Sequence, residues 1–289
     1  SYQDSVMYST AISKYVDGDC PGATRGFRKY ISQFSDDGYF IIQANYYKAE
    51  CDYFNNKENE ALKHYKYVVT QNRNEFTEKS LIRLSTSYYK RKDYKASLDY
   101  FTELEPLAST SNTFINALMG QIRCNYYLKN YSLAKKKAIE LLPVENVPTE
   151  DLVEANMILG RIQLKDNNLR TAKSHFDYVI EKSRNALTAE ALYQRAVIFY
   201  EQDELKNSRE DIYTINEDFS AYEIWVVKGF ILLSDIYVKE KDYFQAKATL
   251  QSIIDNYEKD DGILDICKMK LKEVENLENP EEVIEPEEE

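Results

Sequence analysis

One residue spacing, repeated seven times, limits what this chain can fold into. In each copy a small residue is followed by another twelve positions later, and bulky or core residues follow four and seven positions after the second. The second small residues of neighbouring copies lie 36 to 38 positions apart. The pairs are Ala11/Ala23, Ala49/Ala61, Ser85/Ser97, Ile122/Ala134 (where Ile departs from the rule), Gly160/Ala172, Ala196/Ser208 and Ser234/Ala246. Such a period is typical of a stacked repeat array rather than a domain with one central core.

Each copy reads as two helices joined by a short turn. In the last copy, apolar residues recur at helical spacing over 228–240 and again over 243–257, with Lys241-Asp242 as a polar break between them. The few glycines and prolines, eight and six, disfavour a β-protein with many tight turns. We expect helical hairpins at about 4–34, 38–72, 75–107, 111–142, 149–182, 186–217 and 221–257.

The C-terminal end carries two further features. An amphipathic helix is predicted at about 263–278, with Leu264, Cys267 and Leu271 on one face, and would cap the last hairpin. The segment 279–289 is rich in Glu and Pro, which predicts a disordered acidic tail. The predicted fold is therefore an all-α solenoid, a right-handed superhelix of about seven hairpins plus a capping helix, forming a single array over 1–278.

The charge distribution argues against nucleic acid as a partner. The net charge is −12, but nine glutamates and no basic residue lie between Glu273 and Glu289. Without them the chain has 40 acidic and 37 basic residues and a net charge of −3. Neither the acidic C-terminal segment nor the rest of the chain has the excess of basic residues expected of the positive stripe that binding to a phosphate backbone requires.

The sequence offers little for catalysis. Its two histidines, His64 and His175, each lie three residues after the Ala of a second helix, so they indicate a scaffold position rather than a site. No Gly-rich phosphate loop, HExxH or GxSxG motif occurs, and the four cysteines lack metal-ligand spacing. No apolar run is long enough to span a bilayer. We therefore expect no enzyme activity, no cofactor, no metal site and no membrane span.

The spacing, together with an aromatic residue before each turn, resembles the tetratricopeptide repeat over residues 4–257. The Asp-Tyr pair that opens the second helix in that family is present in Lys92-Asp93-Tyr94 and Lys241-Asp242-Tyr243. The period of about 37 exceeds the family's usual 34, and the closing proline is mostly absent. The resemblance implies that the first helix of each hairpin lines a concave groove that binds a protein or peptide.

The same resemblance supplies candidate groove residues. Counted from the first small residue, the inward positions include Tyr8, Tyr15, Tyr46, Tyr53, Tyr89, Arg123, Tyr126, Arg161, Tyr193 and Tyr200. The position four after the small residue is Tyr in five of seven copies, and a Tyr ring can grip an extended peptide at low entropic cost. Arg123 and Arg161 could receive a carboxylate. The alternative is that these tyrosines pack one hairpin against the next.

A narrower resemblance concerns the compartment. The stretch from Ala23 to Tyr39, followed by Ala44 to Glu50, is similar to bacterial cell-envelope repeat proteins of the BamD and YbgF type, although Phe34-Ser35 replaces their usual Phe-Pro. It implies a non-enzymatic scaffold of a bacterial envelope complex, located in the periplasm, with a cytoplasmic location as the alternative. A second functional alternative is a structural segment of a longer repeat protein, whose partner site lies upstream of residue 1. The sequence predicts neither the partner's identity nor the oligomeric state.

Overall fold

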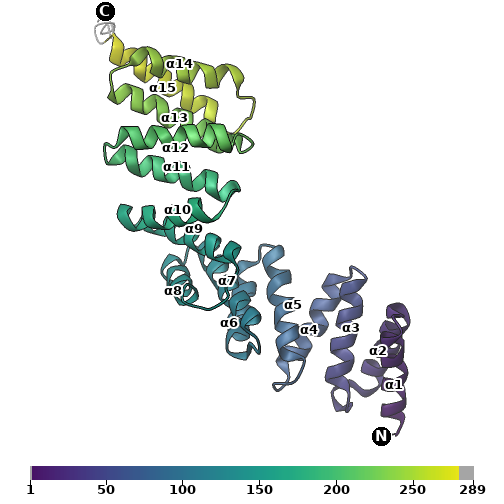
Figure 1. Cartoon of the computed structure of the whole chain (residues 1–289). Coiled ribbons are helices and arrows are strands. Elements are labelled where there is room, and N and C mark those ends of the chain that lie inside the picture. Colours follow the sequence, from purple (N-terminus) through teal and green to yellow (C-terminus); the bar gives the residue numbers. More distant parts are fainter. Residues whose placement is uncertain (1, 280–289) are drawn as a thin grey trace, which may run out of the picture. The chain divides into compact units, whose positions relative to one another are not determined.

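The computed structural model describes residues 2–279, and within them every regular element is helical (Figure 1). The first eight α-helices are α1 (Tyr2–Val16), α2 (Cys20–Phe34), α3 (Ile41–Phe54), α4 (Glu58–Thr70), α5 (Thr77–Lys90), α6 (Tyr94–Leu104), α7 (Ser111–Tyr127) and α8 (Tyr131–Leu141). The others are α9 (Thr149–Lys165), α10 (Leu169–Lys182), α11 (Ala186–Glu201), α12 (Leu205–Asp218), α13 (Glu223–Lys239), α14 (Tyr243–Asn256) and α15 (Ile263–Glu278). Short 3-10 turns occupy Ser35–Asp37 and Glu105–Leu107.

Consecutive helices pack in pairs, from α1 with α2 to α13 with α14, and α15 packs on α14 (Figure 1). The predicted all-α solenoid of helical hairpins is therefore confirmed. The helices group into two compact units, an N-terminal unit that ends at Val147 and a C-terminal unit that begins at Pro148. A single array over 1–278 and a right-handed superhelix stay predictions. The predicted disordered tail, 279–289, lies outside the described residues from position 280 onward.

The repeated small residues meet where the two helices of a hairpin cross. Where the second of them is Ser, its hydroxyl bonds to the backbone of the first: Ser97 Oγ donates to the Ser85 carbonyl at 2.9 Å, and Ser208 Oγ to the Ala196 carbonyl at 2.8 Å. These side chains are fully buried. Two helices can come this close only because neither carries a large side chain at the crossing.

The large residues that follow the small pairs, in all copies but the fourth, where Ala138 takes this position, fill the space beside the crossing. Phe176 of α10 is fully buried and lies against Gly160 of α9, so closely that a Cβ at Gly160 would be 2.5 Å from its ring. Gly120 of α7 meets the ring of Phe101 of α6 in the same manner. The repeat pattern therefore encodes the close packing that joins one helix to the next.

The turn inside each hairpin has one backbone geometry throughout the chain. The residue seven positions after the first small residue has a positive φ, between 57° and 80°, in all seven hairpins. At the third turn the N–H of Lys92 donates to the Tyr89 carbonyl and that of Asp93 to the Tyr88 carbonyl, which is the hydrogen-bond pair of a Schellman motif. Asp93 then caps α6 by accepting from the N–H of Ala96. Only the first of these seven positions is a glycine, Gly18.

Candidate protein-binding surface

In the N-terminal unit the predicted groove residues lie on α1, α3, α5 and α7, the first helices of successive hairpins (Figure 1). The clearest link between two of these helices is made by Arg83 of α5. Its guanidinium nitrogens lie 3.2 Å from both carboxylate oxygens of Glu50 on α3, and it covers the ring of Tyr53 at 4.5 Å. Glu50 also accepts a hydrogen bond from the buried Tyr65 hydroxyl, whose pKa is raised by burial and by this carboxylate. Predicted site residue Tyr53 is thus held half-buried under a cation.

A cluster of five tyrosines lies where α5 meets α6 and α7 meets α8. We call it the tyrosine cluster: Tyr89, Tyr94, Tyr126, Tyr127 and Tyr131. The rings of Tyr94 and Tyr127 stack with centroids 4.5 Å apart, and each of the other three lies within 6.4 Å of at least one ring of the cluster. Tyr127 is 52% exposed, and the other four are partly exposed. The structure thus brings the predicted residues Tyr89 and Tyr126 into one aromatic surface.

The predicted tyrosines nearer the N-terminus pack mainly against neighbouring hairpins. Tyr8 of α1 stacks on Phe40 at 4.4 Å, and Tyr46 of α3 stacks on Phe76 at 4.5 Å. Tyr46 is only 7% exposed, and burial raises the pKa of both hydroxyls. Tyr15 is half-buried with its ring 4.8 Å from that of Tyr47. At these positions the packing role left open by the sequence accounts for most of the ring surface.

In the C-terminal unit the predicted residues take part in contacts between successive first helices. Arg161 of α9 donates two hydrogen bonds, of 2.7 and 2.6 Å, to the carboxylate of Glu190 on α11. Tyr193 lies 5.6 Å from Trp225, and Lys239 lies 4.0 Å above the ring of Tyr200. The carboxylate that Arg161 was predicted to receive is thus already supplied by this chain. Arg123 of α7, in the N-terminal unit, is half-buried.

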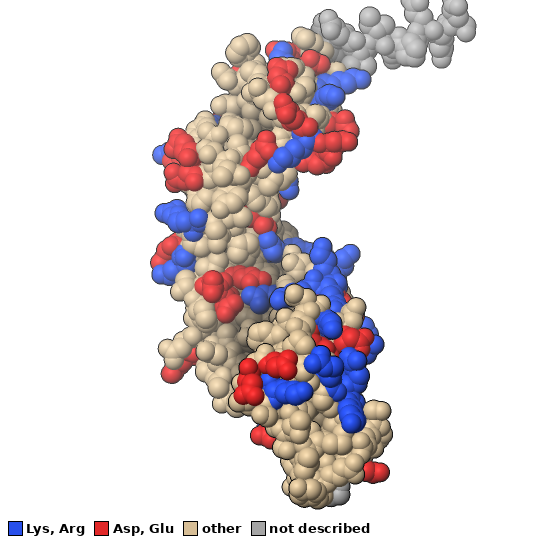
Figure 2. All heavy atoms as spheres, turned by 90° about the vertical axis from the view of Figure 1, so that its right-hand side faces the viewer, with Lys and Arg blue, Asp and Glu red and all other residues tan. Residues whose placement is uncertain are grey.

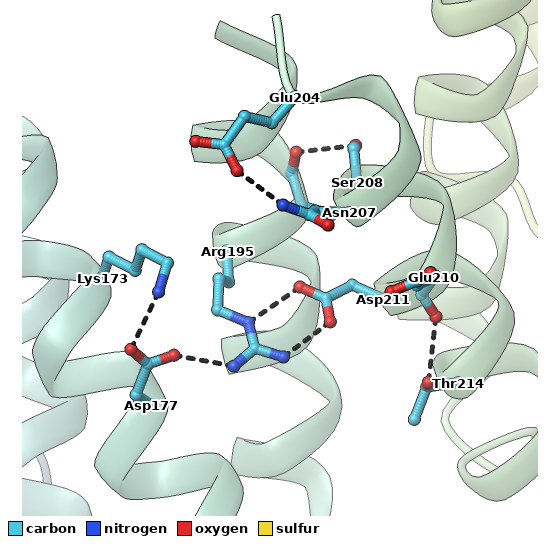
Figure 3. Close-up of polar contacts among 10 residues, drawn as sticks. Lys173, Asp177, Arg195, Glu204, Asn207, Ser208, Glu210, Asp211 and Thr214 are labelled. Carbon is cyan, nitrogen blue, oxygen red and sulfur yellow. Dashed lines mark hydrogen bonds and ion pairs between the residues drawn. The ribbon is translucent and has the colours of Figure 1, made fainter. Parts of the chain in front are cut away.

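An ion-pair cluster that the sequence analysis missed joins three helices of the C-terminal unit (Figure 3). Arg195 of α11 binds both carboxylate oxygens of Asp211 on α12, at 2.8 and 2.6 Å, and one oxygen of Asp177 on α10 at 2.7 Å. Asp177 also accepts a hydrogen bond from Lys173 at 3.1 Å. Burial raises the pKa of Asp211 and outweighs the opposing effect of Arg195. In the sequence, Lys173 and Arg195 adjoin the small positions Ala172 and Ala196, whereas Asp177 and Asp211 adjoin bulky positions, a pattern that does not predict their pairing.

The two histidines occupy equivalent environments, as their matching repeat positions indicated. Nδ1 of His64 lies 2.6 Å from the amide oxygen of Asn45, and Nδ1 of His175 lies 2.8 Å from that of Asn156. Each Asn in turn donates to a backbone carbonyl of its own helix. Burial, and then the charge of Lys48, lower the pKa of His64 to about 4. A shared hydrogen bond at equivalent sites supports a scaffold role for both rings.

Residues 2–279 contain neither a metal-ligand cluster nor a helix suited to span a membrane. No cluster of three or more His, Cys, Asp or Glu side chains that could hold a metal occurs there. No helix in this part of the chain is both long and apolar enough to cross a bilayer.

An apolar hollow of about 490 Å³ lies between α13 and α14 and was not foreseen from the sequence. Its walls include Val226 and Phe230 of α13, and its α14 side is formed by small residues such as Ala248 and Ser252. This volume falls within the range of small-molecule pockets, roughly 300–1,000 Å³. On the α14 side, the small side chains of Ala248 and Ser252 leave space between larger ones such as Gln245 and Ile253.

This arrangement of helices is similar to that of known proteins. Residues 230–260 match the family model of the tetratricopeptide repeat. No curated protein matches the sequence. Among solved structures, the C-terminal part of a repeat protein from Cytophaga hutchinsonii is similar over 89% of this chain and 98% of its own, with a TM-score of 0.62 and 14% identity. A tetratricopeptide repeat protein from Parabacteroides merdae covers 96% of this chain and 100% of its own, with a TM-score of 0.47 and 14% identity. The chain therefore has the fold of tetratricopeptide repeat proteins, and residues 230–260 match the family model in sequence as well.

Proposed function

We propose that the N-terminal unit binds an extended segment of a partner protein, and that the tyrosine cluster is its main contact. The tetratricopeptide repeat fold is a scaffold typically used for protein–protein interaction and is usually non-catalytic. The observation that carries the proposal is the exposure of the cluster. Tyr127 is 52% exposed and Tyr46 7%, so the cluster presents aromatic surface that the buried tyrosines lack.

The geometry of the cluster suits binding of this kind. Each ring is already fixed by a neighbouring ring, so little side-chain entropy is lost when a partner docks. The rings supply apolar area, and their hydroxyls can exchange hydrogen bonds with a peptide backbone. Tyr and Trp are also enriched among residues that dominate binding energy at interfaces.

Site-specific photocrosslinking tests the proposal. A benzoylphenylalanine placed at position 127 should crosslink to a discrete partner in the cells that produce the chain, and one at position 213 should not. Tyr213 is a suitable control because it is also exposed, at 40%, but lies on α12 of the C-terminal unit. No crosslink at position 127, under conditions where the labelled protein is folded, would contradict the proposal and favour a mainly structural segment.

Once a partner is known, alanine variants separate binding from folding. Tyr127→Ala should weaken binding about 10-fold, the effect of losing one hot-spot aromatic. Its helical content should stay unchanged, and its melting temperature should fall only slightly despite the lost stacking on Tyr94, because the ring is half exposed. Tyr46→Ala should instead lower the melting temperature, since Tyr46 is buried against Phe76. Equal loss of stability in both variants would assign the cluster to the core.

We further propose that the partner belongs to a complex of the bacterial envelope, with the chain in the periplasm. The support is the residue pattern from Ala23 to Tyr39 and from Ala44 to Glu50. Release of the chain by osmotic shock, with a cytoplasmic marker protein retained, is the expected result. Retention of the chain together with that marker would instead support the cytoplasmic alternative.

A further inference from the structure

Two cysteines from neighbouring hairpins lie side by side in the N-terminal unit. Cys20 is the first residue of α2 and is partly exposed, whereas Cys51 lies within α3 and is fully buried. The Sγ atom of Cys51 lies 2.8 Å from the Sγ atom of Cys20, across a separation of 31 residues in the sequence. We propose that these two thiols are the site of a disulfide that links the first hairpin to the second.

The arrangement of the two sulfurs supports the bond. A disulfide has an S–S length of about 2.05 Å, so the sulfurs need to approach each other by less than about 1 Å. Both side chains pack in one apolar cluster with rings from three helices, including Tyr15 of α1, Phe27 of α2 and Tyr47 of α3. The helices that carry the thiols are therefore held together before any covalent bond forms.

The other cysteines provide an internal comparison. Cys124 occupies the same repeat position as Cys51, two residues after the first small position, and is equally buried. Its sulfur meets the hydroxyl of Ser97 at 3.4 Å rather than a second thiol. Cys267 lies in an apolar cluster of the C-terminal unit with Val274 and Tyr257. The juxtaposition of thiols is thus specific to the first two hairpins and does not follow from the repeat position.

The difference in exposure sets the order of the chemistry with a disulfide oxidant such as glutathione disulfide. Burial raises the pKa of the Cys51 thiol, so the accessible Cys20 is the group that reacts first. The Cys20 thiolate attacks the oxidant, forming a mixed disulfide and releasing one glutathione thiolate. Cys51 then loses its proton and attacks the Cys20 sulfur, which releases the second glutathione. Two thiols are oxidised to one disulfide, and one glutathione disulfide is reduced to two glutathiones.

The bond would secure the first hairpin of the described chain. In a repeat array each hairpin is stabilised by its neighbours, so a covalent link between two hairpins opposes their separation. A crosslink between α2 and α3 closes a loop of about 30 residues and lowers the entropy of the unfolded state. Because Tyr15 and Tyr47 pack beside the two sulfurs, the same bond also fixes the aromatic contact between α1 and α3.

Oxidation of the purified chain by glutathione disulfide, without denaturant, tests the inference. Alkylation after unfolding should then count two free thiols instead of four, and peptide mapping should recover Cys20 linked to Cys51. The melting temperature should be about 5–10 °C higher than in the reduced chain. Glutathione attached to Cys20 without a crosslink, or a crosslink that forms only in urea, would overturn the proposal.

Variants make the assignment specific. Cys20→Ser should fold normally, because Cys20 is partly exposed, and should lose both the crosslink and the rise in melting temperature. Cys124→Ser, at the position equivalent to Cys51, should keep both. Cys51→Ala, which places a small apolar residue in the buried site, should behave like Cys20→Ser. A rise in melting temperature that survives in Cys20→Ser would show that another thiol is responsible.

Discussion

Neighbouring hairpins of both units share an apolar core, but beside it the N-terminal unit is richer in stacked aromatic rings and the C-terminal unit is richer in ion pairs. Residues 1–147 contain 17 of the 25 tyrosines, and stacked pairs such as Tyr46–Phe76 and Tyr94–Tyr127 join successive hairpins. In the C-terminal unit, Arg161–Glu190 and Arg195–Asp177 link successive hairpins, and Lys270–Asp235 links α15 to the last hairpin. The hairpin geometry is the same in both units, so the repeat allows different chemistry at the joints.

The two units also differ in net charge. Residues 1–147 contain 20 basic and 17 acidic residues, a net charge of +3, whereas residues 148–279 contain 17 basic and 26 acidic residues, a net charge of −9. Figure 2 shows Lys and Arg side chains gathered along one side of the N-terminal unit, in the lower part of the view. Three of the basic residues, Arg25, Arg28 and Lys29, lie on α2 around one shallow pocket. The overall net charge of −12 conceals this difference.

The comparison predicts where each unit is vulnerable. Aromatic contacts carry no charge at neutral pH, so acid and salt affect them little. A buried ion pair is sensitive to loss of either partner, because the remaining charge is then desolvated without compensation. Removing one charge of a buried pair in the C-terminal unit should therefore lower the free energy of unfolding more than removing one charge of an exposed pair.

The largest effect is expected from Arg195→Met. The variant leaves the buried carboxylate of Asp211 without its cation and leaves Asp177 with Lys173 only, which should lower the free energy of unfolding of the C-terminal unit by about 3–5 kcal/mol. Urea unfolding at pH 7 measures the loss. Arg209→Met is the matched control: it removes the more exposed pair with Glu240 and should cost about 1 kcal/mol or less. Equal losses in the two variants would break the proposed contrast.

The stability lost in Arg195→Met should depend on pH. The pKa of Asp211 is already raised by burial, and removal of the guanidinium raises it further. A carboxyl group with a raised pKa in the folded state binds more protons there than when unfolded, so stability falls as pH rises through that pKa. The deficit of Arg195→Met should therefore shrink as pH is lowered below 7. A deficit that is independent of pH would indicate lost packing instead.

The next largest effect concerns acid and the N-terminal unit. The pKa of His64 is lowered to about 4, so its neutral form stabilises the folded state fully above its unfolded pKa of about 6.5. This contribution, about 2–3 kcal/mol, is lost as pH falls from 6.5 to 4. His64→Gln, which can still donate to Asn45, should flatten the acid response of the N-terminal unit, as followed by hydrogen exchange. His175→Gln tests the equivalent bond to Asn156 in the other unit, and an acid response unchanged in His64→Gln would contradict the assignment.

The sequence predicted the fold because the repeat acts through size alone. Small residues at Ala196 and Ser208 must meet, and Ile212 must fill the space beside them, whatever the rest of the sequence is. The repeat spacing does not predict which of the candidate groove tyrosines are exposed. Tyr46 and Tyr53 are seven positions apart on one helix face, yet Tyr46 is buried because Phe76, just before α5, stacks on it.

The spacing of small residues also does not predict which charged residues form ion pairs. Arg161 was predicted to be available for a partner's carboxylate, but Glu190, 29 residues later, already occupies it. Which charged side chains meet depends on the rotation of each helix about its axis, and the small-residue spacing does not specify that rotation to within one side chain. Only part of the tyrosine cluster was predicted. Tyr89 and Tyr126 follow from the repeat positions, whereas Tyr94 and Tyr131 lie on second helices and were not among the predicted groove residues.

A smaller effect tests whether the close approach of a helix to a glycine is common to both units. Gly160→Ala places a methyl group 2.5 Å from the Phe176 ring, and Gly120→Ala places one against the Phe101 ring. Each should lower the free energy of unfolding by about 1–2 kcal/mol, since overpacking outweighs the gain in helix propensity. Gly229→Ala is the control, because its new methyl group would lie 3.3 Å from Ile212 and should be tolerated. Similar losses in Gly120→Ala and Gly160→Ala would show that close helix packing does not differ between the units, whereas a loss in only one of them would add packing to the contrast.

The smallest effect concerns the turns and is expected to be equal in the two units. Lys92 in the N-terminal unit and Lys241 in the C-terminal unit both have φ of 61°, a conformation that is unfavourable for a residue with a Cβ. Lys92→Gly and Lys241→Gly should each raise the free energy of unfolding by about 0.5–1 kcal/mol, reduced from the full strain by the extra freedom of glycine when unfolded. Lys92→Ala and Lys241→Ala keep the Cβ and should give no gain, which separates backbone strain from loss of charge. If glycine stabilises only one unit, the turns are not equivalent, and the difference between the units would extend to the backbone as well as to the side chains at the joints.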